Sequence, residues 1–199
     1  MCASYESQFS IRQLVDAFAH AGVEIGMGGT GLPNLEPRDE VRPTDTDRVL
    51  RALPGAETAE LIPMRFGFPP PRPKAGPVIN FRSEGRTFGN GPRGGRCLVP
   101  VSGFYEFTGD RYPKTRWVLR GVDQPFLALA AVWRAGPDGE AFSLLTAEPG
   151  PDVAPYHTRG VIPLPPAAWA DWLLDRRPST ELLTPPPAGT LTAEIKPRG

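Results

Sequence analysis

Short apolar runs, each bounded by proline, glycine or charged residues, are the feature that most constrains how this chain can fold. The runs are rich in branched and aromatic residues, which favour strands over helices. The 26 prolines are spread between the runs rather than gathered in one linker. The pattern predicts an α+β fold with a mixed, largely antiparallel, β-barrel-like core and a few flanking helices, in a single domain over residues 1–199. The runs are LIPMRFGF, RCLVPVSGFYEF, RWVLRG, PFLALAAVW, AFSLLTA and RGVIPL.

Two helices are expected beside this sheet. Apolar residues recur at helical spacing over 11–21 after Ser10, which has the spacing of a capping box with Gln13. A second helix is expected over AAWADWLLD, which two prolines precede. Residues 26–43 are rich in glycine, proline and charge without a sustained period, so they are predicted to form a loop.

The formal net charge of zero hides a segregation of charge along the chain. Residues 65–120 hold eleven Lys and Arg against three acids, a balance of +8 that the remaining residues offset with −8. Nearly all of these cations are arginines, whose planar guanidinium suits phosphate and stacks on bases. Two readings stay open: a polyanion-binding face, or arginines that a GC-rich genome scatters over the fold.

The two cysteines do not make a disulfide framework, which is typical of a reducing cytoplasm. No apolar run approaches the roughly 20 residues of a membrane span, so we expect a soluble protein with no membrane contact. Cys97, within an apolar run, is expected to be a buried small hydrophobe. No metal-ligand cluster or phosphate-binding glycine motif is evident, and no metal or cofactor is expected.

Cys2 follows the initiator methionine directly. Loss of Met1 would leave an α-amine and a thiol on adjacent carbons, with reference pKa values of about 7.7–8.0 and about 8.5. Such a 1,2-aminothiol condenses with an aldehyde through its amine and then closes a thiazolidine ring through its thiol. Because any residue can follow Met1, the position alone does not establish this chemistry.

Three further segments carry residues suited to proton transfer or binding. Glu106 ends an aromatic-rich strand, where desolvation would raise its pKa, unless it faces water. His157 lies in a turn-like segment before a strand, which suits either an acid/base residue or a surface loop. Asn80 and Arg82, two residues apart, would point to the same side of an extended chain, or Asn80 would cap a turn.

These segments, in this order, resemble the SRAP family, the abasic-site-processing proteins historically called SOS response-associated peptidases. The similarity is strongest over residues 1–174, and the most specific part is the long RCLVP–GFYE block followed by a single downstream HxR. Other matching segments are MC, RPTD, MRFGF, NFRSEG, LALAAVW and WADWL.

The resemblance implies a β-barrel-like core with a positively charged groove that binds single-stranded DNA containing an abasic site. It implies that Cys2 captures the ring-opened deoxyribose as a thiazolidine crosslink, with Asn80, Glu106 and His157 in the same active site. It also implies a monomer that works on DNA in the cytoplasm, associated with the nucleoid. The residues that the matching segments assign to DNA binding are Arg82, Arg159, Arg65, Phe66 and Arg96.

The chain departs from the family pattern at several positions around this expected site. The family usually begins MCGR and this chain begins MCAS, so Ser4 stands where an arginine is common. Phe66 and Pro71 replace tryptophans of a RWGLIPSW-like segment, and NFRSEG replaces NARAET. These changes bear on DNA affinity and preferred junction geometry, because the predicted catalytic residues are all retained.

In the expected mechanism His157 opens the sugar ring and Glu106 transfers protons while the α-amine of Cys2 forms a Schiff base. Two alternatives use the same chain differently. Cys2 could be a cysteine peptidase nucleophile with His157 as base, acting on the bond to Met1 or on a foreign peptide. The chain could also be a non-catalytic single-strand binder in which Cys2 is incidental.

Overall fold

The computed structural model of the protein describes residues 3–26 and 36–197. Its strands form two sheets, and the smaller sheet has five strands in the order β14-β9-β8-β1-β3, all paired antiparallel. Polar and charged residues make up much of its outer strands, so pairing with the neighbouring strand, more than burial of apolar side chains, stabilises them. The strands are β14 (Leu191–Ile195), β9 (Thr115–Gly121), β8 (Gly103–Thr108), β1 (Tyr5–Ser7) and β3 (Arg38–Val41).

The larger sheet curls into a barrel-like ring. Its order is β12-β11-β10-β7-β4-β5-β2, and a parallel pairing of β11 with β5 closes a ring of β11, β10, β7, β4 and β5. Two short strands extend it, since β13 pairs with β10 and β6 pairs with β11. The strands are β12 (Gly160–Val161), β11 (Gly139–Ala147), β10 (Leu127–Gly136), β7 (Gly94–Val101), β4 (Thr46–Arg51), β5 (Ala59–Phe66), β2 (Ile25–Gly26), β13 (Pro163–Leu164) and β6 (Asn80–Arg82).

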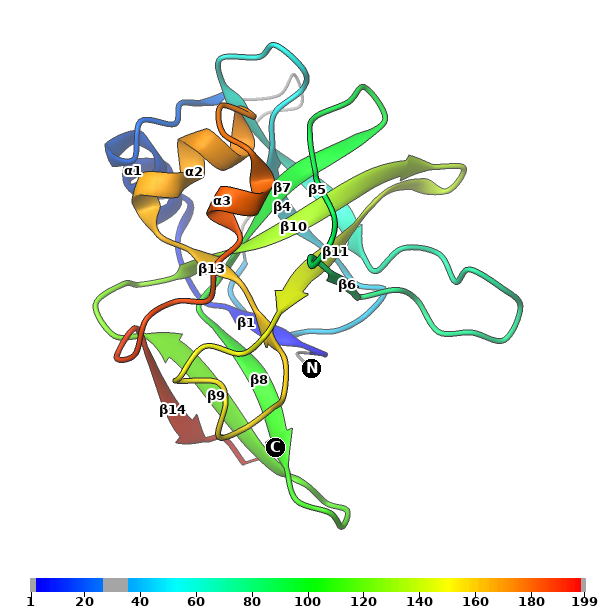
Figure 1. Cartoon of the computed structure of the whole chain (residues 1–199), viewed down its shortest axis with the longest axis vertical. Coiled ribbons are helices and arrows are strands. Elements are labelled where there is room, and N and C mark those ends of the chain that lie inside the picture. Colours follow the sequence, from blue (N-terminus) through cyan, green and yellow to red (C-terminus); the bar gives the residue numbers. More distant parts are fainter. Residues whose placement is uncertain (1–2, 27–35, 198–199) are drawn as a thin grey trace.

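Three helices, α1 (Ile11–His20), α2 (Pro166–Leu173) and α3 (Ser179–Leu182), gather on one side of the larger sheet, away from β8, β9 and β14 (Figure 1). The predicted capping box of α1 is present, because the Ser10 hydroxyl accepts from the Gln13 N–H and the Gln13 side chain accepts from the Ser10 N–H. No helix in the described part of the chain is long and apolar enough to cross a membrane.

Two apolar clusters share the interior. The first lies between the helices and the larger sheet and includes Phe18, Phe126 and Trp169, whose rings stack on one another. The second lies between the two sheets and includes Phe66 and Phe104. Because alternate residues of a strand face opposite sides, membership of a cluster tells which side each residue of a strand faces.

The predicted α+β class with a largely antiparallel, barrel-like core is confirmed. The predicted loop over 26–43 is wrong in part, because strand β3 lies within it and pairs with β1. The RCLVPVSGFYEF run forms two strands in different sheets, β7 and β8, which meet at Ser102. Cys97 is fully buried as predicted, and burial raises the pKa of its thiol well above the ordinary value.

Candidate functional site

Glu106 is a buried carboxylate on strand β8. Its exposed fraction is zero, so the alternative that it faces water is wrong. Phe104, two residues earlier on the same strand, belongs to the cluster between the sheets. The alternation of side chains therefore turns Glu106 toward the space between the sheets and turns Tyr105 toward the opposite face. A carboxylate placed there needs neighbouring polar or charged groups, because burying an isolated charge is costly.

Asn80 and Arg82 face the same space from the larger sheet. Strand β6 runs parallel to β11 with Asn80 opposite Leu144. Leu144 belongs to the cluster between the sheets, whereas Phe81 packs on the cluster beneath the helices. Asn80 is half-buried and Arg82 is exposed at the end of the strand. The segment is a strand, so the alternative of a turn capped by Asn80 is wrong.

His157 is brought to β8 by a packed aromatic pair. The ring of Tyr156 lies 4.8 Å from that of Trp117 on β9, and Trp117 is the register partner of Glu106. In Figure 1 the turn that precedes β12, drawn in yellow, passes alongside β8 and β9. His157 therefore approaches the end of β8 that carries Glu106, in the half-buried position that the sequence left undecided.

The backbone of Arg159 holds the imidazole of His157. The Nδ1 atom lies 3.0 Å from the Arg159 N–H nitrogen and 3.1 Å from the Arg159 carbonyl oxygen. Nδ1 can thus accept from the N–H or, as N–H, donate to the carbonyl, and Nε2 is correspondingly a donor or an acceptor. Burial lowers the pKa of His157, and the positive charges of Arg159 and Lys114 lower it further. The ring is neutral near pH 7 and able to accept a proton.

Arg159 ties together the strands that carry these residues. Its guanidinium donates to the Thr146 carbonyl at 2.9 Å and pairs with Glu84 at 2.8 Å. Thr146 is the register partner of Arg82, and Glu84 follows β6. The hydrogen bond from Arg159 lowers the pKa of Glu84, which burial would slightly raise. Arg159 therefore fixes the end of β6 relative to the His157 turn.

Cys2 lies outside the described residues, but the chain directly after it is placed. Strand β1 pairs antiparallel with β8, with Tyr5 opposite Phe104. The pairing continues at Ser4, whose carbonyl accepts a 3.1 Å hydrogen bond from the Tyr105 N–H. Continued by one residue toward the start of the chain, the same register sets Ala3 against Glu106.

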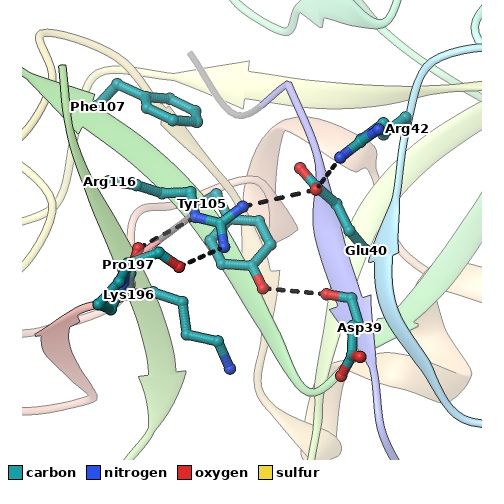
Figure 2. Close-up of a pocket in the computed structure, with 8 residues that line it drawn as sticks. All are labelled: Asp39, Glu40, Arg42, Tyr105, Phe107, Arg116, Lys196 and Pro197. Carbon is teal, nitrogen blue, oxygen red and sulfur yellow. Dashed lines mark hydrogen bonds and ion pairs between the residues drawn. The ribbon is translucent and has the colours of Figure 1, made fainter. Parts of the chain in front are cut away.

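A cavity of about 680 Å³ lies on the other face of β8, lined by Tyr105 and Phe107 among others. Arg42 and Arg116 reach toward Glu40 from two sides of it (Figure 2), at 2.7 and 3.5 Å. The Ser4 hydroxyl donates to the same carboxylate at 2.8 Å. Burial would raise the pKa of Glu40, but these hydrogen bonds and charges together hold it below its ordinary value.

A buried carboxylate, Glu6 on β1, neutralises the neighbouring cations of this face. It is 2% exposed and accepts from the Arg120 Nε at 2.6 Å and the Tyr105 hydroxyl at 3.0 Å. The Lys196 Nζ atom lies 3.7 Å from Oε2 of Glu6, the oxygen that accepts from Tyr105. Burial and the nearby Glu6 charge raise the pKa of Tyr105 to about 12. This network was missed in the sequence, where Glu6 stands in a short polar segment without a distinguishing pattern.

Two of the residues expected to contact DNA are buried, and a third, Arg65, is partly buried. Phe66 is fully buried, with its ring stacked 5.1 Å from that of Phe142. Arg96 is 2% exposed, and its guanidinium donates to the carbonyls of Phe88 and Arg177. Arg65 is half-buried and donates to the Gly67 carbonyl. Phe66 and Arg96 are corrected to structural roles, because neither presents a surface to a DNA strand.

The comparisons with known proteins agree with this fold. A family model described as SOS response associated peptidase (SRAP) matches residues 1–195. A crystal structure of a protein from Bordetella bronchiseptica covers 99% of the chain and 100% of its own length, with 20% identity and a TM-score of 0.71. A phage-related protein from the same organism covers 99% and 95%, with 20% identity and a TM-score of 0.73. A protein from Bacteroides thetaiotaomicron covers 98% and 91%, with 15% identity and a TM-score of 0.70. No curated protein matches the chain.

Proposed function

The chain belongs to the SRAP family, and from this membership we propose that it is an abasic-site sensor that crosslinks covalently to single-stranded DNA through Cys2. Family membership supports a role in the response to DNA damage. The proposed reaction shields the lesion: Cys2, exposed after loss of Met1, captures the ring-opened deoxyribose of an abasic site as a thiazolidine.

One observation carries the proposal: strand β1 is paired along β8 so that the start of the chain runs toward Glu106. Cys2 is joined to Ala3 by one peptide bond, which spans about 3.8 Å between Cα atoms. Asn80 faces the same space between the sheets, and Tyr156 packing brings the His157 turn to the same end of β8. A terminal amine, a buried carboxyl group and an imidazole are the groups that imine formation and ring closure require.

His157 opens the sugar in this mechanism. With its Nδ1–H on the Arg159 carbonyl, the Nε2 atom takes the proton of the C1′ hydroxyl as the bond from C1′ to the ring oxygen breaks. The imidazolium then returns this proton to the ring oxygen. The products are a free aldehyde at C1′ and a hydroxyl at C4′, with no net change in protons. The lowered pKa of His157 keeps it in the base form near neutrality.

Glu106 moves protons while the new bonds form. The α-amine of Cys2 adds to the aldehyde carbon, and Glu106 carries the two amine protons in turn from the nitrogen to the aldehyde oxygen, which leaves as water and returns Glu106 to its starting form. The thiol sulfur then adds to the imine carbon, and its proton passes to the nitrogen to complete the thiazolidine. One water is released overall. Ring closure removes the imine that would otherwise promote β-elimination and strand breakage.

Asn80 and Arg82 position the DNA in the proposed complex. The Asn80 amide offers both a donor and an acceptor to a sugar hydroxyl, and the exposed Arg82 offers a guanidinium to the adjacent phosphate. Arg159 acts through the β6 end and the His157 turn that it joins, and Arg65 supports the chain at the end of β5. Binding of this kind depends strongly on salt and little on sequence.

The test mixes the mature protein with a single-stranded oligonucleotide that carries one abasic site and analyses the product by denaturing gel and intact mass. The expected adduct has the summed mass of protein and oligonucleotide less one water. Cys2→Ala should give none, and acetylation of the α-amine should abolish the adduct while a simple thiol nucleophile persists. An adduct of the same mass with Cys2→Ala would refute the assignment.

The same experiment separates the two alternatives. A peptidase would retain turnover of a peptide substrate after α-amine acetylation, because only its thiol and His157 are needed. A non-catalytic binder would retain equal affinity for abasic and intact oligonucleotides without any adduct that resists denaturation. Either result in place of a thiazolidine would overturn the proposal.

A further inference from the structure

An arginine–aromatic surface made by Phe81, Phe88, Arg86 and Arg134, with the buried Phe68 against it, lies on the side of β6 opposite to Asn80. The guanidinium carbon of Arg134 is 4.8 Å from the ring centre of Phe68 and 5.6 Å from that of Phe81. The guanidinium carbon of Arg86 is 4.8 Å from the same Phe81 ring. Two arginines from distant parts of the chain thus lie against one aromatic side chain.

The two arginines of this surface carry uncompensated positive charge. Both are exposed, and neither has an acidic side chain within 4.0 Å among residues 3–26 and 36–197. Like charges gathered around one ring repel each other, and a bound anion between them would relieve that repulsion. The Phe81 ring, which both guanidinium groups approach, packs edge-on against the Phe88 ring with 6.4 Å between the ring centroids. The surface is therefore built to receive negative charge.

The aromatic rings also prepare the arginines for binding. A guanidinium held over a ring face can keep N–H groups free for a phosphate and offer its other face to a base. Its side chain has already lost much of its rotamer freedom, so less is lost when a ligand binds. This combination of cations and aromatic faces is typical of surfaces that track a single strand.

The surface adjoins the proposed site across the width of one strand. Asn80 and Arg82 face the space between the sheets, and Phe81 between them faces the other way. Strand β6 pairs with β11 alone among the described strands, so no other strand occupies its second edge. A strand whose abasic nucleotide lies near Asn80 would cross this edge and meet Arg86 and Arg134.

From these features we infer that the arginine–aromatic surface binds the phosphates and bases of nucleotides that flank the lesion in single-stranded DNA. The inference rests on the proposed function for the path of the DNA strand, but the charge and the aromatic stacking of the surface do not depend on Cys2. Phe81 stands where the family pattern has alanine, so this contact would be a property of this chain and of members that share the aromatic residue.

The test measures reversible binding of a fluorescent single-stranded oligonucleotide without an abasic site, so that no crosslink forms. Arg86→Ala with Arg134→Ala should raise the dissociation constant about tenfold and reduce the slope of log affinity against log salt by about 1.4, or about 0.7 per phosphate contact. The matched control is Arg12→Ala, which removes one exposed arginine on α1. The double substitution to lysine should keep the salt slope and weaken binding less, because it retains charge without the flat stack.

A dissociation constant and slope that match the Arg12→Ala control would overturn the inference. Phe81→Ala tests the stacking, and its thermal unfolding reports whether a loss of binding comes from a loss of fold. The intact oligonucleotide tests the surface independently of the crosslink. If the double variant binds it more weakly but wild type forms no adduct with abasic DNA, the inference about the surface holds and the crosslinking chemistry is refuted. If wild type forms the adduct but the double variant binds the intact oligonucleotide as wild type does, the crosslinking chemistry holds and the inference about the surface is refuted.

Discussion

The two faces that flank the candidate site differ in how their arginines are compensated. On the outer face of the smaller sheet, Arg116 pairs with Glu40 (Figure 2), and Arg120 pairs with Glu6. Around β6, Arg82 on one side and Arg86 and Arg134 on the other have no acidic side chain within 4.0 Å in the part of the chain that the structure describes, although the charge of Arg82 contributes to the lowered pKa of Glu84. We therefore expect a polyanion to bind around β6, although both faces are rich in arginine.

A segment that is rich in basic residues in the sequence therefore does not necessarily form a positively charged surface in the fold. Arg116 and Arg120 belong to the basic stretch of 65–120, but the acids that neutralise them come from β1 and β3, far away in the chain. The basic stretch thus divides into a structural part and an exposed part. Four predictions test this division.

The largest expected effect comes from removing the acid at the centre of the compensated face. Glu6→Ala removes the buried carboxylate that pairs with Arg120 and accepts from the Tyr105 hydroxyl, and leaves these two groups only Glu194 and the Asp39 carbonyl as partners. Breaking a buried pair costs about 3–5 kcal/mol of unfolding free energy. Urea denaturation measures it. Glu194→Ala, which removes an exposed partner of the same Arg120, should cost about 0.5 kcal/mol or less. Equal losses for the two variants would show that burial does not set the role of Glu6.

His157 tests the chemistry on the side where charge is uncompensated. His157→Ala should slow adduct formation about 100-fold, the effect typical of a lost general base. Because burial and the charges of Arg159 and Lys114 lower the pKa of His157, the ratio of wild-type to variant rates should stay flat down to pH 6.5 and fall only below it. The ratio cancels the titration of the α-amine, which both proteins share. A ratio that already falls above pH 7 would contradict the lowered pKa.

Arg82 and Arg116 are a matched pair of charge removals on the two faces. Arg82→Gln should raise the dissociation constant for single-stranded DNA several-fold and reduce the salt slope by about 0.7, because one phosphate contact is lost. Arg116→Gln should leave that slope unchanged, because Glu40 already neutralises the cation. Fluorescence anisotropy at several salt concentrations measures both. Equal slopes for the two variants would mean that compensation by acids does not decide where DNA binds.

Much of the fold followed from the sequence because the central strands are apolar. The runs around Phe66, Leu98 and Leu129 lie in the ring of the larger sheet, where both sides of a strand are buried. Strands β1 and β3 were not recognised, because their residues are mostly polar and the neighbouring strand determines their pairing. The same strands carry Glu6 and Glu40, so the compensating acids were missed together with them.

The residue types of the candidate site were suggested by sequence, but their surroundings were not. Glu106, Asn80 and His157 were selected for chemistry, and the structure brings them toward one end of β8 by pairings that no local pattern reveals. Phe66 and Arg96 were expected to bind DNA because they lie in segments that match the family, and they are buried. Burial depends on the tertiary structure. The sequence alone therefore does not tell whether an arginine in a basic stretch is buried and bonded to backbone carbonyls or exposed to a phosphate.

The smallest expected effect is an acid-dependent loss of stability at Glu40. Its folded pKa lies below the ordinary 4.5, so its charged form is favoured by folding. Its contribution of about 1 kcal/mol should be complete above pH 4.5 and disappear as the pH falls through the lowered folded pKa. Glu40→Gln should therefore be less stable than wild type at pH 6 and approach it at pH 3, as measured by urea denaturation. Glu57→Gln, at an exposed position with no ion pair among the described residues, should match wild type at both pH values. A pH-independent difference between Glu40→Gln and wild type would mean that packing, and not the compensation of Arg42 and Arg116, accounts for the role of Glu40 on this face.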